Sequence, residues 1–113
     1  MPKVVWRADA ILRLVEENAL NGAEEWARAD VLPLSQENCP VDTGTMRGTG
    51  SVVREGKTIE IGFGGPSAPY TVRQHEDLTL NHPTGQAKWL ENAFNWQLPM
   101  LPERVGDRLR KVL

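Results

Sequence analysis

One proline-containing corner, Cys39 to Arg47, most constrains what this chain can fold into. It reads Cys-Pro-Val-Asp-Thr-Gly-Thr-Met-Arg and follows a long stretch with helical spacing. Pro40 disfavours helical geometry at Cys39, so the helix should end there. Asp42 can accept hydrogen bonds from the free N–H groups of a following turn, and Gly44 tolerates a positive φ. The corner therefore predicts a change from helix to sheet.

The residues before the corner have the spacing of an amphipathic helix that begins at Asp9. Apolar or small residues recur at steps of three and four, and charged residues occupy the other side. The apolar set is Ile11, Leu14, Val15, Ala19, Gly22, Ala23 and Trp26, and the charged set is Arg13, Glu16, Glu17, Glu24, Glu25 and Arg28. Pro33 would cost about 3 kcal/mol inside a straight helix. We therefore expect a kink or restart between Asp30 and Leu34, and a helix end by Cys39.

Two segments rich in β-branched residues follow the corner and predict an antiparallel hairpin. They are Gly48–Arg54 and Thr58–Phe63, with Glu55-Gly56-Lys57 between them. Glycines and prolines then predict a surface loop from Gly64 to Pro69.

Helical spacing resumes at Gln86, and Pro99 and Pro102 should interrupt it. A last amphipathic turn or two should follow. Val105, Leu109 and Val112 should share an apolar face. The charged face opposite it is most simply solvated, with an interface to a neighbouring subunit as the alternative.

These elements predict a single α+β domain, in which a long N-terminal helix and a C-terminal helix pack on a small antiparallel sheet. The length of 113 residues suits one domain. The expected parts are an arm at 1–8, a helical part at 9–39, the corner and hairpin at 40–67, a loop at 68–85 and a C-terminal helical part at 86–113.

The composition argues against several classes of protein. With 13 basic and 15 acidic residues the formal charge is −2, which provides no broad attraction for nucleic acid phosphates or an acidic membrane surface. A single cysteine, Cys39, excludes an internal disulfide and should be a small buried residue, reduced in a cytoplasm. No apolar run approaches the roughly 20 residues that cross a bilayer. The four tryptophans, at positions 6, 26, 89 and 96, need a core or an interface.

Asp42-Thr43-Gly44 is also the tripeptide around the catalytic carboxylate of aspartic proteases, which could pair two carboxylates across a dimer. That site belongs to an all-β framework, whereas here a helical stretch and Pro40 precede the tripeptide. The capping role described above is therefore the better interpretation of Asp42, and we expect no enzyme activity.

Metal-capable side chains gather at His75, Glu76, Asp77 and His82, but their spacing fits no set of three ligands around one ion. The sequence predicts instead that His75 and Glu76 join a hydrogen-bond network that holds the loop. We expect neither a metal site nor a cofactor.

Three pieces of the chain stand in a fixed order and carry a resemblance. They are the corner at 39–47, Ala68-Pro69-Tyr70 with His75-Glu76, and Gly85-Gln86-Ala87-Lys88-Trp89-Leu90-Glu91. Together they resemble the neck and tail-completion proteins of long-tailed bacteriophages, a family often labelled minor capsid or head-tail connector. The resemblance covers residues 9–97. The chain departs from the family pattern in Pro33, in its tryptophan-rich helices and in the extra segment Pro99–Leu113.

The resemblance implies a non-enzymatic virion protein of the phage neck, made in the bacterial cytoplasm. It would form a homo-oligomeric ring, hexameric in the expected case, that joins the head-closure or connector protein to the tail-tube or tail-terminator protein. DNA would pass through the lumen without specific binding, and no membrane is involved. A mildly acidic chain agrees with this, because it does not grip phosphates.

The resemblance also assigns positional roles to seven residues. Asp42, Thr43, Gly44 and Arg47 would fix the corner from which the hairpin projects. Tyr70, His75 and Glu76 would anchor a loop that meets a ring above or below. The alternatives are a minor capsid protein on the head or portal, a toxin-like or stress-related binding domain of a prophage, and the dimeric aspartic protease.

Overall fold

The structure is a computed structural model of the chain and describes residues 1–40, 45–64 and 88–113. The helices before the hairpin are α1 (Ala8–Trp26), the π-helical turn η1 (Ala27–Val31), α2 (Leu32–Asn38) and α3 (Thr45–Gly48). The hairpin consists of β1 (Ser51–Glu55) and β2 (Thr58–Gly62), and it is followed by α5 (Trp89–Gln97), the 3-10 turn η2 (Leu98–Met100) and α6 (Leu101–Val112). The predicted α+β class is confirmed, with long helices packed on a two-stranded antiparallel sheet.

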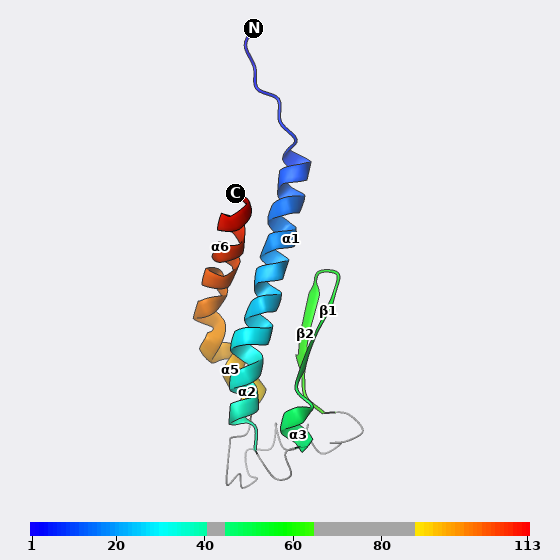
Figure 1. Cartoon of the computed structure of the whole chain (residues 1–113), viewed down its shortest axis with the longest axis vertical. Coiled ribbons are helices and arrows are strands. Elements are labelled where there is room, and N and C mark those ends of the chain that lie inside the picture. Colours follow the sequence, from blue (N-terminus) through cyan, green and yellow to red (C-terminus); the bar gives the residue numbers. More distant parts are fainter. Residues whose placement is uncertain (41–44, 65–87) are drawn as a thin grey trace.

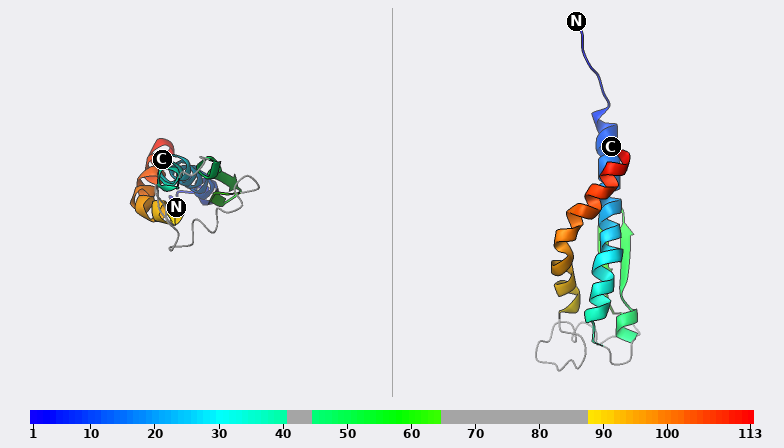
Figure 2. Two further views of the ribbon diagram at one scale, coloured as in Figure 1. Left: turned by 90° about the horizontal axis from the view of Figure 1, so that it is seen from below. Right: turned by 60° about the vertical axis from the view of Figure 1, so that its left-hand side comes forward.

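α1 is the central element of the fold, with α6 on one side and the hairpin on the other (Figure 1). The chain runs in opposite directions in α1 and α6, so the C-terminus lies beside the N-terminal half of α1 (Figure 1). The molecule is elongated, with extents of 73 × 26 × 20 Å. Residues 1–7 extend beyond α1 as an exposed arm without helix or strand (Figure 2).

The predicted interruption near Pro33 takes the form of a wide helical turn. The Leu32 N–H donates to the Ala27 carbonyl oxygen, five residues back, and α2 starts at that point. Pro33 therefore falls in the first turn of α2, where a missing backbone donor costs least. The helix ends as the sequence predicted, because Cys39 has φ −66° and ψ 134°, an extended conformation that precedes Pro40.

The hairpin differs from the prediction at its first residues. Gly48 ends α3, and the strand begins at Ser51. The intervening Thr49 and Gly50 N–H groups donate to the carbonyl oxygens of Met46 and Arg47, at 3.2 and 3.4 Å, so this backbone continues the helical turn.

The strands pair from Ser51 with Gly62 to Glu55 with Thr58. They are joined by the two-residue turn Gly56-Lys57, and Gly56 has φ +58°. A positive φ at the first turn position is the geometry for which glycine is favoured in tight hairpins.

The C-terminal helical part is longer than predicted. We expected a last turn or two after the prolines, but α6 has 12 residues. Pro99 lies in the first turn of η2 and Pro102 in the first turn of α6. Both prolines thus start helices rather than end them. α5 begins at Trp89, after Lys88 with φ +58°.

Two small apolar clusters hold the elements together. The first contains Trp26, Ala27, Val31 and Val52, and β2 adds the partly buried Ile59 and Ile61 to it. The second contains Cys39, Met46 and Trp89, with Phe63 packed against it. The Trp26 ring meets Phe94 edge-on with centroids 5.0 Å apart, and its Nε1 donates to the Gln97 carbonyl oxygen at 2.8 Å. Cys39 is buried, as predicted.

Candidate functional site

Arg47 is the one residue of the predicted corner set that lies in the described part of the chain. From α3 its Nη2 donates to the carbonyl oxygens of Cys39, at 2.9 Å, and Glu37, at 3.2 Å. Gln36 donates back to the Arg47 carbonyl oxygen at 3.5 Å. These acceptors belong to the last turn of α2, whose carbonyls have no helical partner. A guanidinium at this end also suits the negative pole of the helix. Arg47 therefore ties α3 to the C-terminal end of α2.

The other predicted site residues lie outside the described residues. They are Asp42, Thr43, Gly44, Tyr70, His75 and Glu76, together with the loop at 68–85 and His82.

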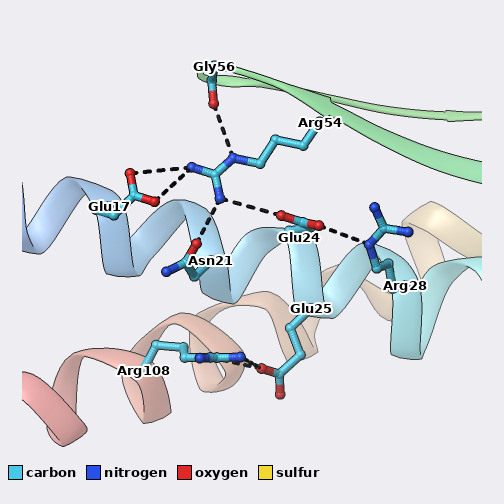
Figure 3. A network of polar contacts seen from close by, with 8 residues as sticks. All are labelled: Glu17, Asn21, Glu24, Glu25, Arg28, Arg54, Gly56 and Arg108. Carbon is cyan, nitrogen blue, oxygen red and sulfur yellow. Dashed lines mark hydrogen bonds and ion pairs between the residues drawn. The ribbon is translucent and has the colours of Figure 1, made fainter.

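A second set of polar contacts, centred on Arg54, attaches the hairpin to α1 (Figure 3). Arg54 lies on β1, and its side chain is only 17% exposed. Its Nη1 donates to Asn21 Oδ1 at 2.7 Å and lies 3.4 Å from Glu24 Oε1. Its Nη2 lies 3.3 Å from Glu17 Oε1, and its Nε donates to the Gly56 carbonyl oxygen at 3.1 Å. One guanidinium thus connects three successive turns of α1 to the hairpin turn.

Neighbouring ion pairs extend this contact along α1. Arg28 Nε lies 2.9 Å from Glu24 Oε2, and Lys57 Nζ lies 2.6 Å from Glu16 Oε1. The hydrogen bond from Arg28, aided by Arg54, lowers the pKa of Glu24. The hydrogen bond to Glu16 raises the pKa of Lys57. The charged side of α1 therefore contacts the hairpin. The sequence pattern indicated only that these charged residues lie opposite the apolar side of the helix.

Arg104 and Arg108 join α6 to the helical part before the corner. Arg104 lies 2.8 Å from Asp30 Oδ2 through its Nε and 3.0 Å from Glu25 Oε1 through its Nη1. Arg108 Nη2 lies 2.6 Å from Glu25 Oε2, as Figure 3 shows. The hydrogen bond from Arg108 lowers the pKa of Glu25, and the bond to Asp30 raises the pKa of Arg104. The charged face of this helix was expected to be solvated, and for these two arginines that expectation was wrong.

A glycine sets the distance between the two helices. A Cβ built on Gly22 would lie 2.8 Å from the Val105 Cα and 3.0 Å from the Arg104 carbonyl oxygen. Backbone atoms cannot swing away as a side-chain end can. The contact therefore requires a residue without a side chain, and this close approach brings Arg104 within reach of Glu25 and Asp30.

An open groove of about 730 Å³ lies between α1 and the hairpin. Its lining residues are Arg13, Glu16, Glu17, Leu20, Glu24, Arg28, Arg54, Gly56 and Lys57. Charges of both signs line it and most of them pair with each other, so the groove offers little to a charged ligand. Within residues 1–40, 45–64 and 88–113, no group of three or more His, Cys, Asp or Glu side chains could hold a metal ion.

A smaller hollow of about 270 Å³ lies between α2 and α5. Leu34 and Asn38 line it from α2, and Asn92 and Trp96 line it from α5. The side of this hollow formed by Trp96 is open, because that residue is 79% exposed.

Large apolar side chains are exposed at both ends of the molecule. Near the N-terminus they are Val4, Val5, Trp6, Ile11, Leu12 and Leu14, and around α5 they are Phe94, Trp96, Leu98 and Met100. Trp26 and Trp89 are buried in the core, whereas Trp6 and Trp96 are 63% and 79% exposed. Two of the four tryptophans thus remain outside the core of a single chain.

Among the described helices, none has the length and apolar character needed to span a bilayer. Comparisons of the chain with family models, with curated proteins and with solved structures each found no match.

Some contacts of this site were not predicted from the sequence. The roles of Arg54 and Arg104 depend on segments distant along the chain, and no local pattern marks their partners. A signal did exist for Gly22, because a glycine on the apolar side of a helical pattern often marks a close packing contact.

Proposed function

We propose that this protein is a structural virion subunit of a bacteriophage neck, which forms a homo-oligomeric ring between the head connector and the tail and lets DNA pass. The resemblance of residues 9–97 to phage neck and tail-completion proteins suggests this function. The structural observation that supports it best is the shape of the single chain.

That shape is far more extended than a self-sufficient domain of this length. The radius of gyration is 18.8 Å, against about 13 Å expected for a compact chain of this size. Among residues 1–40, 45–64 and 88–113, eight apolar residues are buried in the core, while fourteen large apolar residues are exposed. A chain with this balance gains stability by burying apolar surface against neighbouring copies.

The contacts around α1 suit a subunit that transmits force between neighbours. Arg54 attaches the hairpin to one side of α1, and Arg104 and Arg108 attach α6 to the other. Several charge-assisted hydrogen bonds across an elongated shape fix the relative orientation of its elements more strongly than apolar contacts alone. The ring position, six-fold symmetry and the neighbours above and below belong to the same proposal.

The test is to locate the protein in virions. A C-terminal tag labelled with gold should give a signal at the head–tail junction in negative-stain images, and particles lacking the protein should have full heads without attached tails. Label on the head surface would instead support the minor capsid alternative. Firmly tailed, infectious particles without this protein would refute both the neck role and the ring.

A peptide-cleavage assay at acid pH separates this proposal from the dimeric protease. We expect no cleavage by the purified chain. Cleavage that is abolished by Asp42→Asn would establish the enzyme instead.

A further inference from the structure

We propose that the N-terminal arm of one copy binds the hollow between α2 and α5 of the next copy, with Trp6 as its anchor. The inference rests on the proposed function, because it specifies how the subunits of such a ring would hold one another. Here the arm is residues 1–7, and the hollow is the one lined by Leu34, Asn38, Asn92 and Trp96.

The arm exposes large apolar side chains, as expected of a segment that binds a partner. Val4 is 88% exposed, Val5 82% and Trp6 63%. Three consecutive large apolar side chains in water are unfavourable, and burial against a partner would remove that cost. Tryptophan is also one of the residue types enriched among the anchors of protein interfaces.

The hollow has the size and lining for one such anchor. Its volume of about 270 Å³ lies below the range of about 300 to 1,000 Å³ typical of sites for drug-sized ligands, so a single large side chain suits it better. Leu34 and the exposed Trp96 provide apolar contact, and the Trp96 ring can form an aromatic pair with the indole of Trp6. The amide oxygen of Asn38 is a suitable acceptor for an indole N–H.

Charge favours the same pairing. The arm carries Lys3 and Arg7, and it contains no acidic residue. The two helices that line the hollow contain only acidic charges, Glu37 in α2 and Glu91 in α5. Arg7 also contacts Asp9 through exposed side chains, and Glu91 also contacts the half-buried Lys88 at 3.4 Å, which lowers but does not reverse the acidic character of α5. A basic segment thus meets an acidic surface.

Geometry excludes the arm of the same chain as the occupant. The arm and the hollow lie toward opposite ends of the long axis, with residue 1 beyond α1 and α2 and α5 at the far end (Figure 1). From Ala8 to Leu34 the helical backbone advances about 39 Å at 1.5 Å per residue. Seven extended residues reach at most about 25 Å. The arm therefore reaches only the hollow of another molecule.

A contact between an arm and a hollow joins two different surfaces and is therefore heterologous. Each subunit binds one neighbour through its arm and another through its hollow, so subunits add in one direction until a ring closes. This differs from a two-fold dimer, in which the arms of two copies would meet each other. The distinction provides a direct test by cross-linking.

The variants Val5→Cys and Asn92→Cys each add one exposed cysteine to a chain whose own Cys39 is buried, and they should be mixed and oxidised. We expect a mixed disulfide dimer and no dimer from either variant alone. A homodimer of Val5→Cys alone, or no cross-link in the mixture, would overturn the inference.

Sedimentation of the full chain measures the energetic importance of the anchor. Trp6→Ala and Trp96→Ala should each weaken self-association by roughly tenfold or more. Val53→Ala, an exposed valine on the hairpin, is the control and should have no effect. Unchanged association of Trp6→Ala would contradict the anchor role, and so would a wild-type chain that stays monomeric at high concentration.

The results distinguish this contact from the function on which it rests. Gold label at the neck together with a failed cross-link would remove only the arm contact. A specific cross-link in a protein that is absent from virions would retain the contact and remove the neck role.

Discussion

Gly22→Ala offers the sharpest test of how the helices are packed. In an exposed helix the substitution would stabilise by about 1 kcal/mol, because alanine has the higher helix propensity. Here the new Cβ would meet the Val105 Cα at 2.8 Å and the Arg104 carbonyl oxygen at 3.0 Å. Overpacking costs typically 1 to 3 kcal/mol, and the upper part of that range, about 2 to 3 kcal/mol, applies here because the atoms met belong to the backbone. Less the gain of about 1 kcal/mol, we expect a net loss of about 1 to 2 kcal/mol.

For a chain of this length that loss corresponds to a fall in Tm of about 4 to 8 °C. Thermal unfolding followed by circular dichroism, with urea unfolding as a second measurement, would determine it. Gly106→Ala is the matched control, because it also lies in a helix and its new Cβ would meet only the mobile end of Arg110, at 3.3 Å. The control should be as stable as the wild type or more so. A Gly22→Ala protein as stable as Gly106→Ala would refute the close helix contact.

Three further predictions concern the contacts that α1 makes. Arg54→Met should destabilise the protein by about 1 to 3 kcal/mol, because the guanidinium holds the hairpin to α1. Amide hydrogen exchange should become faster in the hairpin than in α6, and an equal increase in both elements would contradict this role. In the folded chain the pKa values of Glu24 and Glu25 lie below the ordinary 4.5. Their ionised carboxylates therefore stabilise the folded state above pH 4.5, and this stabilisation is lost as the pH falls through the lowered pKa values. Urea unfolding at pH 7, 4 and 3 should show this loss for the wild type and a smaller one for the Glu24→Gln, Glu25→Gln double variant. Trp26→Phe should cost about 1 to 3 kcal/mol in urea unfolding, because it leaves the Gln97 carbonyl oxygen without its donor; an unchanged midpoint would show that this bond contributes nothing.

The sequence predicted the helical and hairpin elements because their signals are local. Pro40 determines the backbone of the residue before it, so the helix end at Cys39 could be predicted without knowing any partner. The alternation of β-branched residues and Gly56 likewise indicated a hairpin, whose turn is formed by Gly56 and Lys57.

Prolines showed the limit of that local reasoning. A proline is unfavourable inside a helix but favourable in its first turn, and the residue type alone does not distinguish the two positions. Pro33, Pro99 and Pro102 all lie in first turns, so helical structure continues after each of them. The C-terminal helix was therefore predicted to be too short.

The candidate site was less predictable, because its contacts join segments far apart in the chain. Arg104 meets Asp30 across 74 positions, and Arg54 meets Asn21 across 33. A charged residue with helical spacing looks the same whether its face meets water or another helix. Of the four residues expected to fix the corner, Arg47 contacts the end of α2, and Asp42, Thr43 and Gly44 lie outside the described part of the chain.

The wide turn at Ala27–Val31 has a consequence for how this chain tolerates changes in length. Each residue of an α-helix turns its side chains by about 100°. The Leu32 N–H bonds to the Ala27 carbonyl oxygen five residues back, so this turn holds one residue more than an ordinary α-helical turn. If one residue were removed from the turn, the same two groups would form an ordinary α-helical bond, and Leu34 and Asn38 would keep their directions beside α5. A residue removed from the regular part of α1 would instead turn everything beyond it by about 100°. A single deletion should therefore be tolerated better at Ala27–Val31 than within α1.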